Sequence, residues 1–272
     1  LAYALFGQHL PPPFDHRGYA FEQVVEQIAY GTEGIYGIPT YVSATYIFLF
    51  ILFGSFLEKA GMIKLFTDVS LGLVGHKMGG AAKVSVLSSG LMGTISGSGV
   101  ANVVTTGQFT IPLMKRFGYR PAFAGGVEAT ASSAGQIMPP IMGAGAFIMA
   151  EITGIPYTDI AVAAIIPAVL YFVSIYFMVD FEAARKGMRG MRKDEIPLFS
   201  KLVKQAYLFA PIIILIAALF MGYSVIRAGT LATASAAVVS WLSPNKMGLR
   251  AILRALQLAG TMSIQIIAVC AC

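Results

Sequence analysis

Two short segments of the chain carry the residue types best suited to binding a small cation. The first is residues 96–99 (SGSG) with Asn102, in the middle of residues 84–114, a 31-residue interval without a charged side chain. The second is residues 132–140 (SSAGQIMPP). Neutral oxygens can together replace the hydration shell of a hard cation such as sodium. The side-chain oxygens available here belong to Ser96, Ser98, Asn102, Ser132, Ser133 and Gln136.

The composition is that of a polytopic all-α membrane protein. Of 272 residues, 57% are hydrophobic and 12% are charged, and the mean hydropathy is +0.74, whereas soluble domains carry about 25% charged residues. The net charge of +6 comes from basic residues in short runs between apolar segments. This pattern is typical of cytoplasmic loops and excludes a nucleic-acid-binding face.

The lengths of the charge-free intervals indicate how the chain crosses the bilayer, because one helical crossing takes about 20 apolar residues. Residues 38–57 and 160–179 each fit one transmembrane helix. Residues 205–226 fit another, and the small side chains of 228–243 suit close packing between helices more than contact with lipid.

The two candidate ion segments interrupt intervals that do not fit a single crossing. Residues 84–114 are too long for one span and too short for two, so we predict a re-entrant hairpin whose turn is the SGSG segment. The alternative, that the glycines of this segment only allow tight helix packing, does not explain its length. Pro139-Pro140 breaks residues 121–150 into a discontinuous transmembrane helix, with halves at about 122–133 and 141–150. Such interruptions at mid-membrane are how secondary transporters hold ions and substrate.

The distribution of basic residues places the loops. Residues 180–204 form a basic linker and are predicted to be cytoplasmic, whereas 151–159 and the acidic segment 1–37 are predicted to be periplasmic. Residues 58–83, predicted as a cytoplasmic amphipathic helix, and the turn at 115–120 are basic. Both flanks of residues 84–114 are therefore on one side, as a hairpin requires.

Residues 86–107 (VLSSGLMGTISGSGVANVVTTG), 135–140 (GQIMPP) and 147–151 (FIMAE) closely resemble the large membrane subunit of TRAP transporters, the tripartite ATP-independent periplasmic transporters, in their fused-permease branch. The resemblance covers roughly residues 14–272. It implies sodium-driven uptake of organic acids in the cytoplasmic (inner) membrane of a bacterium or archaeon. The implied partners are a periplasmic substrate-binding protein and a small membrane subunit or its fused equivalent, with sodium as coupling ion, no other cofactor and no transition metal.

The resemblance also implies a fold and a set of site residues. The family has two inverted repeats and an elevator-like movement, and this chain would hold the first repeat, with residues 205–272 as the truncated opening of the second. The sequence starts at Leu1 and ends within an apolar segment, so we expect a fragment. The residues that match one sodium site of the family are Ser96, Gly97, Ser98, Asn102, Gly135, Gln136 and Pro139.

The remaining candidates concern substrate binding and other classes of protein. Ser132, Ser133 and Glu128 are candidate substrate ligands, and Glu128, the only charge in residues 121–150, alternatively pairs with Lys115, Arg116 or Arg120. An enzyme is not expected, since no predicted span holds a nucleophile with a base in reach. A stand-alone ion-coupled carboxylate carrier is the nearest alternative. A less favoured alternative is a channel with a re-entrant filter loop.

Overall fold

The computed structural model describes residues 2–192, 195–197, 202–203, 205–242 and 247–271, and every regular element in these ranges is helical. Part of the basic linker predicted at 180–204 and the connection at 243–246 lie outside the described residues. Three described helical segments are long and apolar enough to cross a membrane: Ile38–Ala60, Tyr157–Arg185 and Arg250–Ala268. Shorter apolar helices occupy Ala144–Thr153, Ala206–Phe220 and Val225–Trp241. The chain is thus an all-α protein with several apolar helices.

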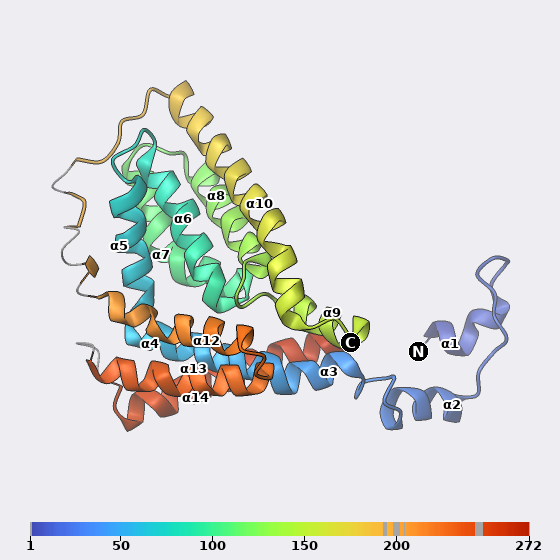
Figure 1. Cartoon of the computed structure of the whole chain (residues 1–272). Helices are drawn as coiled ribbons and strands as arrows, with labels where there is room; N and C mark the ends of the chain where they lie inside the picture. The colour runs from blue at the N-terminus through green and yellow to red at the C-terminus, as the bar shows by residue number, and fades with distance from the viewer. Residues whose placement is uncertain (1, 193–194, 198–201, 204, 243–246, 272) are drawn as a thin grey trace.

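The helices form two packed groups that meet at an angle (Figure 1). The first group contains α3 (Ile38–Val42), the π-helical turn η3 (Ser43–Ile47) and α4 (Phe48–Ala60), which form one continuous helical segment, with α12 (Ala210–Phe220), α13 (Val225–Leu242) and α14 (Leu249–Ala271). Phe53, Leu57 and Leu215 are buried in its core. Because Ala228, Ala232 and Ala236 recur every four residues and are fully buried, α13 packs closely on α4.

The second group contains α5 (Met62–Val74), α6 (Gly80–Ser96), α7 (Gly99–Arg116), α8 (Pro121–Ser133) and the long helix α10 (Tyr157–Arg185). Its core includes Val86, Met114, Val127 and Val179. Helices α6 and α7 lie side by side as a hairpin and α8 packs against both (Figure 1). Helix α10 crosses their outer side with most of its apolar surface exposed.

Short elements complete the chain. The N-terminal segment contains α1 (Ala2–Phe6), a 3-10 turn η1 (Gly7–His9), α2 (Phe21–Val25) and a π-helical turn η2 (Glu26–Tyr30), and it extends away from both groups (Figure 1). The 3-10 turn η4 (Ala134–Ile137) follows α8, and α9 (Ala144–Thr153) precedes α10. The 3-10 turn η6 (Ala206–Phe209) leads into α12.

The helix ends differ from the sequence-based boundaries in several places. The hairpin helices begin at Gly80 and end at Arg116, so Lys83 lies inside α6 and not in the preceding segment. Residues 249–271 form one continuous helix that runs through Gly260. Gly260 alone does not end it, because an isolated glycine costs a helix only about 1 kcal/mol. That the hairpin is re-entrant, and that the chain is one of two inverted repeats, remain predictions.

Candidate ion-binding site

The turn of the α6–α7 hairpin depends on a glycine. Helix α6 ends at Ser96, and the next residue, Gly97, has a φ of +58° in the left-handed region that other residues adopt at a cost. Ser98 then caps α7, since its Oγ accepts a hydrogen bond from the backbone N–H of Ala101 at 3.3 Å. The N–H of Asn102 bonds to the carbonyl of Ser98 at 3.0 Å. Only two residues, Gly97 and Ser98, therefore connect α6 to α7, as the SGSG segment predicts.

The second interruption lies between α8 and α9. Helix α8 ends at Ser133, η4 follows, and residues 138–143 run without helical structure, with a cis peptide bond between Pro139 and Pro140. The N–H of Gly143 bonds to the carbonyl of Gln136 at 2.7 Å, which closes the segment into a loop. The helix is interrupted at the residues where the sequence predicts a break, and α9 starts three residues later than expected.

The two interruptions touch each other. The N–H of Ile141 donates to the carbonyl of Thr94 at 3.2 Å, so the loop binds the last turn of α6. Gly93 and Gly135 face each other without side chains, and a Cβ on Gly97 would lie 2.7 Å from the carbonyl oxygen of Met142. The end of α6 and the loop after α8, about 40 residues apart in the chain, are thus in direct backbone contact.

The predicted ion ligands occupy different positions at this junction. Asn102 is fully buried, its Nδ2 donates to the carbonyl of Ser89 at 2.8 Å, and its Oδ1 lies 3.3 Å from the hydroxyl of Thr106. Gln136 is largely exposed, with its Nε2 beside Gly99. Pro139 is half-buried. Ser133 is exposed and donates to the carbonyl of Ala129 in its own helix at 2.8 Å.

A cavity of about 320 Å³ lies beside the hairpin turn. Ser96, Gly97 and Ser98 line it from the hairpin, and α4, α9 and α14 close its other sides. Its polar groups include Glu58 of α4 and Gln265 of α14, while most of its surface is apolar. The hairpin turn therefore faces a space between the two groups of helices.

Glu128 lies in a different environment from the one predicted. Its carboxylate is fully buried between α6, α7 and α8 and lies within hydrogen-bonding distance of five hydroxyl groups. These belong to Ser85, Ser89, Thr106, Thr110 and Ser132, which with Glu128 we call the Glu128 network. Among the described residues no basic side chain pairs with Glu128. Neither Glu128 nor Ser132 lines the cavity at the hairpin turn.

Sequence reasoning missed four of these hydroxyl residues, although a signal was present. Ser85 and Ser89 are four residues apart on α6, Thr106 and Thr110 on α7, and Glu128 and Ser132 on α8. Residues with this spacing lie on the same face of a helix. A polar pair on each of three consecutive apolar helices is the pattern that would have identified the network.

A buried ion pair and a buried tyrosine join the other end of the hairpin to its neighbours. Lys83 of α6 pairs with Asp180 of α10, and its Nζ lies 4.9 Å from the ring centroid of Tyr176. Tyr119, in the turn between α7 and α8, donates to the carbonyl of Gly79 at 3.3 Å. Burial, followed by the nearby Glu182 and Asp180, raises the pKa of Tyr119 to about 12. The Lys83–Asp180 pair attaches the hairpin to α10, and Tyr119 joins the α7–α8 turn to the start of α6.

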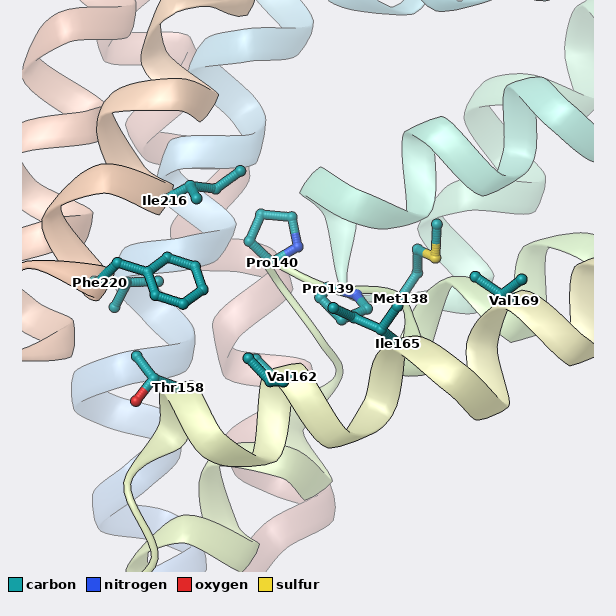
Figure 2. A pocket seen from close by; sticks show the side chains of 11 residues that line it. Met138, Pro139, Pro140, Thr158, Val162, Ile165, Val169, Ile216 and Phe220 are labelled. Carbon is teal, nitrogen blue, oxygen red and sulfur yellow. The ribbon is translucent and has the colours of Figure 1, made fainter.

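A second cavity, of about 260 Å³, lies behind the Pro139-Pro140 bond (Figure 2). Figure 2 shows Val162 and Ile165 of α10 and Phe220 of α12 around it. Among the described residues that line it, Thr158 alone carries a hydroxyl. With so few oxygens, this cavity is unsuited to an ion and we place the candidate site at the hairpin turn.

The apolar helices and the two interruptions brought into contact define an integral membrane protein of the transporter class. The chain belongs to the tripartite ATP-independent periplasmic transporter family, DctM component, whose sequence model matches residues 2–272. Members of this family are transporter permeases and not enzymes. The family assignment agrees with the resemblance seen in the sequence.

Three curated relatives show what similar chains transport. A 2,3-diketo-L-gulonate TRAP transporter large permease protein of Escherichia coli is 27% identical over 61% of this chain and 39% of its own length. A sialic acid TRAP transporter large permease protein of Vibrio cholerae is 29% identical over 61% of this chain and 39% of its own. A C4-dicarboxylate counterpart of Pseudomonas aeruginosa is 29% identical over 52% and 33%. The chain thus spans less than half of the length of these relatives.

Proposed function

We propose that this chain is part of a permease that couples sodium entry to the uptake of organic acids. The observation that carries the proposal is the direct contact between the hairpin turn and the broken helix, through Ile141 and Thr94 and through the facing glycines 93 and 135. Interrupted helices expose carbonyl oxygens and helix ends that serve as ion and substrate ligands in transporters. Asn102 at this junction adds a buried carboxamide oxygen.

Sodium is the ion that we propose for this junction. The donors are neutral oxygens of Ser96, Ser98, Asn102 and Gln136, together with the backbone carbonyls of Gly97, Gly135 and Pro139. Such a set suits a hard monovalent cation. Asn102 supports the assignment most directly, because its Nδ2 is held by Ser89 and its Oδ1, which lies 3.3 Å from the hydroxyl of Thr106, has a second lone pair for an ion.

Organic acids are the substrate class that we propose. The three relatives are named for 2,3-diketo-L-gulonate, sialic acid and C4-dicarboxylates, each of which carries a carboxylate. The cavity beside the hairpin turn would hold the substrate next to the ion, close to the N-terminal end of α7, where helix dipole and free N–H groups favour an anion. Ser133 stays a candidate ligand, whereas the hydroxyl of Ser132 donates to the carboxylate of Glu128 inside the protein.

We further propose the partners and location that the family name implies. A periplasmic substrate-binding protein would deliver the acid, and a small membrane subunit or fused equivalent would complete the permease in the cytoplasmic membrane. The elevator-like movement and the second inverted repeat belong to the same proposal.

The test is uptake of labelled organic acids by proteoliposomes that contain the complete permease, with its binding protein and an imposed sodium gradient. Uptake that requires both sodium and the binding protein is the expected result. Uptake with sodium alone would indicate a stand-alone carrier. Flux that no gradient drives would indicate a channel.

A further inference from the structure

The Glu128 network joins the two hairpin helices to α8 through one carboxylate. Oε1 of Glu128 accepts from the hydroxyls of Ser89 at 2.9 Å and Ser132 at 3.0 Å, and also from Thr106. Oε2 accepts from Ser85 and Thr110, each at 2.6 Å. A carboxylate is costly to bury without donors, and hydroxyls from α6, α7 and α8 supply them here. The network therefore sets the register of three helices.

Two members of the network also hold Asn102. The backbone carbonyl of Ser89 accepts the hydrogen bond from Asn102 Nδ2 at 2.8 Å. The hydroxyl of Thr106 lies 2.7 Å from the backbone carbonyl of Asn102 and 3.3 Å from its Oδ1. Both residues contact Oε1 of Glu128. Ser85 and Thr110 contact Oε2, and neither has a hydrogen bond to Asn102.

We propose that Glu128 is a positioning residue that orients the Asn102 carboxamide for the ion, acting through Ser89 and Thr106. This inference rests on the proposed function, since it concerns the same ion site. Both carboxylate oxygens of Glu128 accept from hydroxyl donors at hydrogen-bond distances, so we assign Glu128 a positioning role and not that of an ion ligand.

A matched pair of threonines on α7 provides the experiment. Thr106 and Thr110 lie one helical turn apart, and the hydroxyl of each is within hydrogen-bonding distance of Glu128 and of the backbone carbonyl four residues earlier. Thr106→Val and Thr110→Val therefore remove equivalent hydroxyl groups. Of these two threonines, only Thr106 contacts Asn102. In the complete transporter we expect Thr106→Val to raise the sodium concentration for half-maximal uptake about three- to tenfold, the effect of one hydrogen bond. We expect less than about twofold for Thr110→Val.

Variants of Glu128 separate positioning from charge. Glu128→Gln keeps an oxygen acceptor toward Ser89, Thr106 and Ser132 and loses the charge, so it should restore most of the sodium affinity that Glu128→Ala loses. Equal losses in both variants would show that the charge itself is required and would overturn the inference. Equal shifts in Thr106→Val and Thr110→Val would overturn it as well.

Hydrogen exchange gives a readout that does not depend on sodium coupling. We expect the amides of residues 98–106 to exchange faster in the purified Thr106→Val protein than in Thr110→Val. If uptake by the wild-type transporter did not depend on sodium, the proposed function would be refuted. The comparison of hydrogen exchange between Thr106→Val and Thr110→Val would still be valid. Unchanged hydrogen exchange in Thr106→Val would refute the positioning role of Glu128. This measurement can be made even if the Glu128→Ala variant fails to fold.

Discussion

Gly93 and Gly135 meet so closely that a β-carbon on Gly93 would lie 2.4 Å from the Cα of Gly135. A β-carbon on Gly135 would lie 2.8 Å from the Cα of Gly93. The obstructing atoms are backbone in both cases, so no side-chain rotation relieves the overlap. This contact joins the hairpin to the broken helix, and the predictions below follow from it and from its surroundings.

Gly93→Ala should force the hairpin away from the broken helix. Overpacking of this kind costs about 1–3 kcal/mol, so we expect a lower melting temperature and a large loss of sodium-dependent uptake. Gly126→Ala in α8 is the control, because a β-carbon there meets no atom within 4 Å. A Gly93→Ala protein that transports like Gly126→Ala would show that the contact is not needed.

Gly97→Ala tests the hairpin turn. The left-handed conformation costs an alanine about 1–2 kcal/mol, and the added carbon would also clash with the carbonyl of Met142. Gly154→Ala is the control: it has the cost of a left-handed backbone, since φ there is +68°, but no clash, since an added β-carbon meets no atom within 4 Å. We expect thermal unfolding at a lower temperature for Gly97→Ala than for Gly154→Ala. Equal melting temperatures would argue against a tight turn.

Lys83→Met should destabilise the protein by removing the partner of Asp180. Loss of one member of a buried pair costs about 3–5 kcal/mol. We expect about 2 kcal/mol here, because the side chain of Asp180 is 32% exposed. Thermal unfolding of the double variant Lys83→Met/Asp180→Leu should recover much of the loss. Arg185→Ala, at an exposed pair with Glu182, should have little effect.

Asn102→Ala and Gln136→Ala should both weaken the sodium dependence of uptake in the complete transporter. The effect of Asn102→Ala should be the larger, about tenfold in the half-saturating sodium concentration, because its carboxamide is buried and held by Ser89. Gln108→Ala, an exposed amide on α7, is the control. Unchanged sodium activation in both site variants would contradict the proposed ion site.

Ser98→Cys tests the side from which the hairpin enters the membrane, in a protein whose native Cys270 and Cys272 are replaced by Ser. A membrane-impermeant thiol reagent should reach this position from the cytoplasm in at least one transport state, because Ser98 lines the cavity at the turn. Labelling only from the outside, in every state, would contradict a hairpin that enters from the cytoplasm.

The amino-acid sequence was sufficient to locate the two interruptions. Gly97 favours a helix end and Ser98 a helix start by their local chemistry, and Pro139-Pro140 cannot continue a helix, whatever surrounds it. It was not sufficient to place helix boundaries where packing decides them. Lys83 looked like a residue outside the hairpin, yet it lies within α6 because Asp180 and Tyr176 of α10 compensate its burial.

The sequence by itself determined the helical, membrane-embedded character of the chain and the positions of its breaks, because hydrophobicity, proline and glycine act through the local backbone and the solvent. Only the tertiary structure decided that Gly93 faces Gly135 and that Glu128 is surrounded by hydroxyls from α6, α7 and α8 and has no basic partner among the described residues. Both depend on how each helix is rotated about its axis against its neighbours. That rotation is set by packing over the whole group of helices.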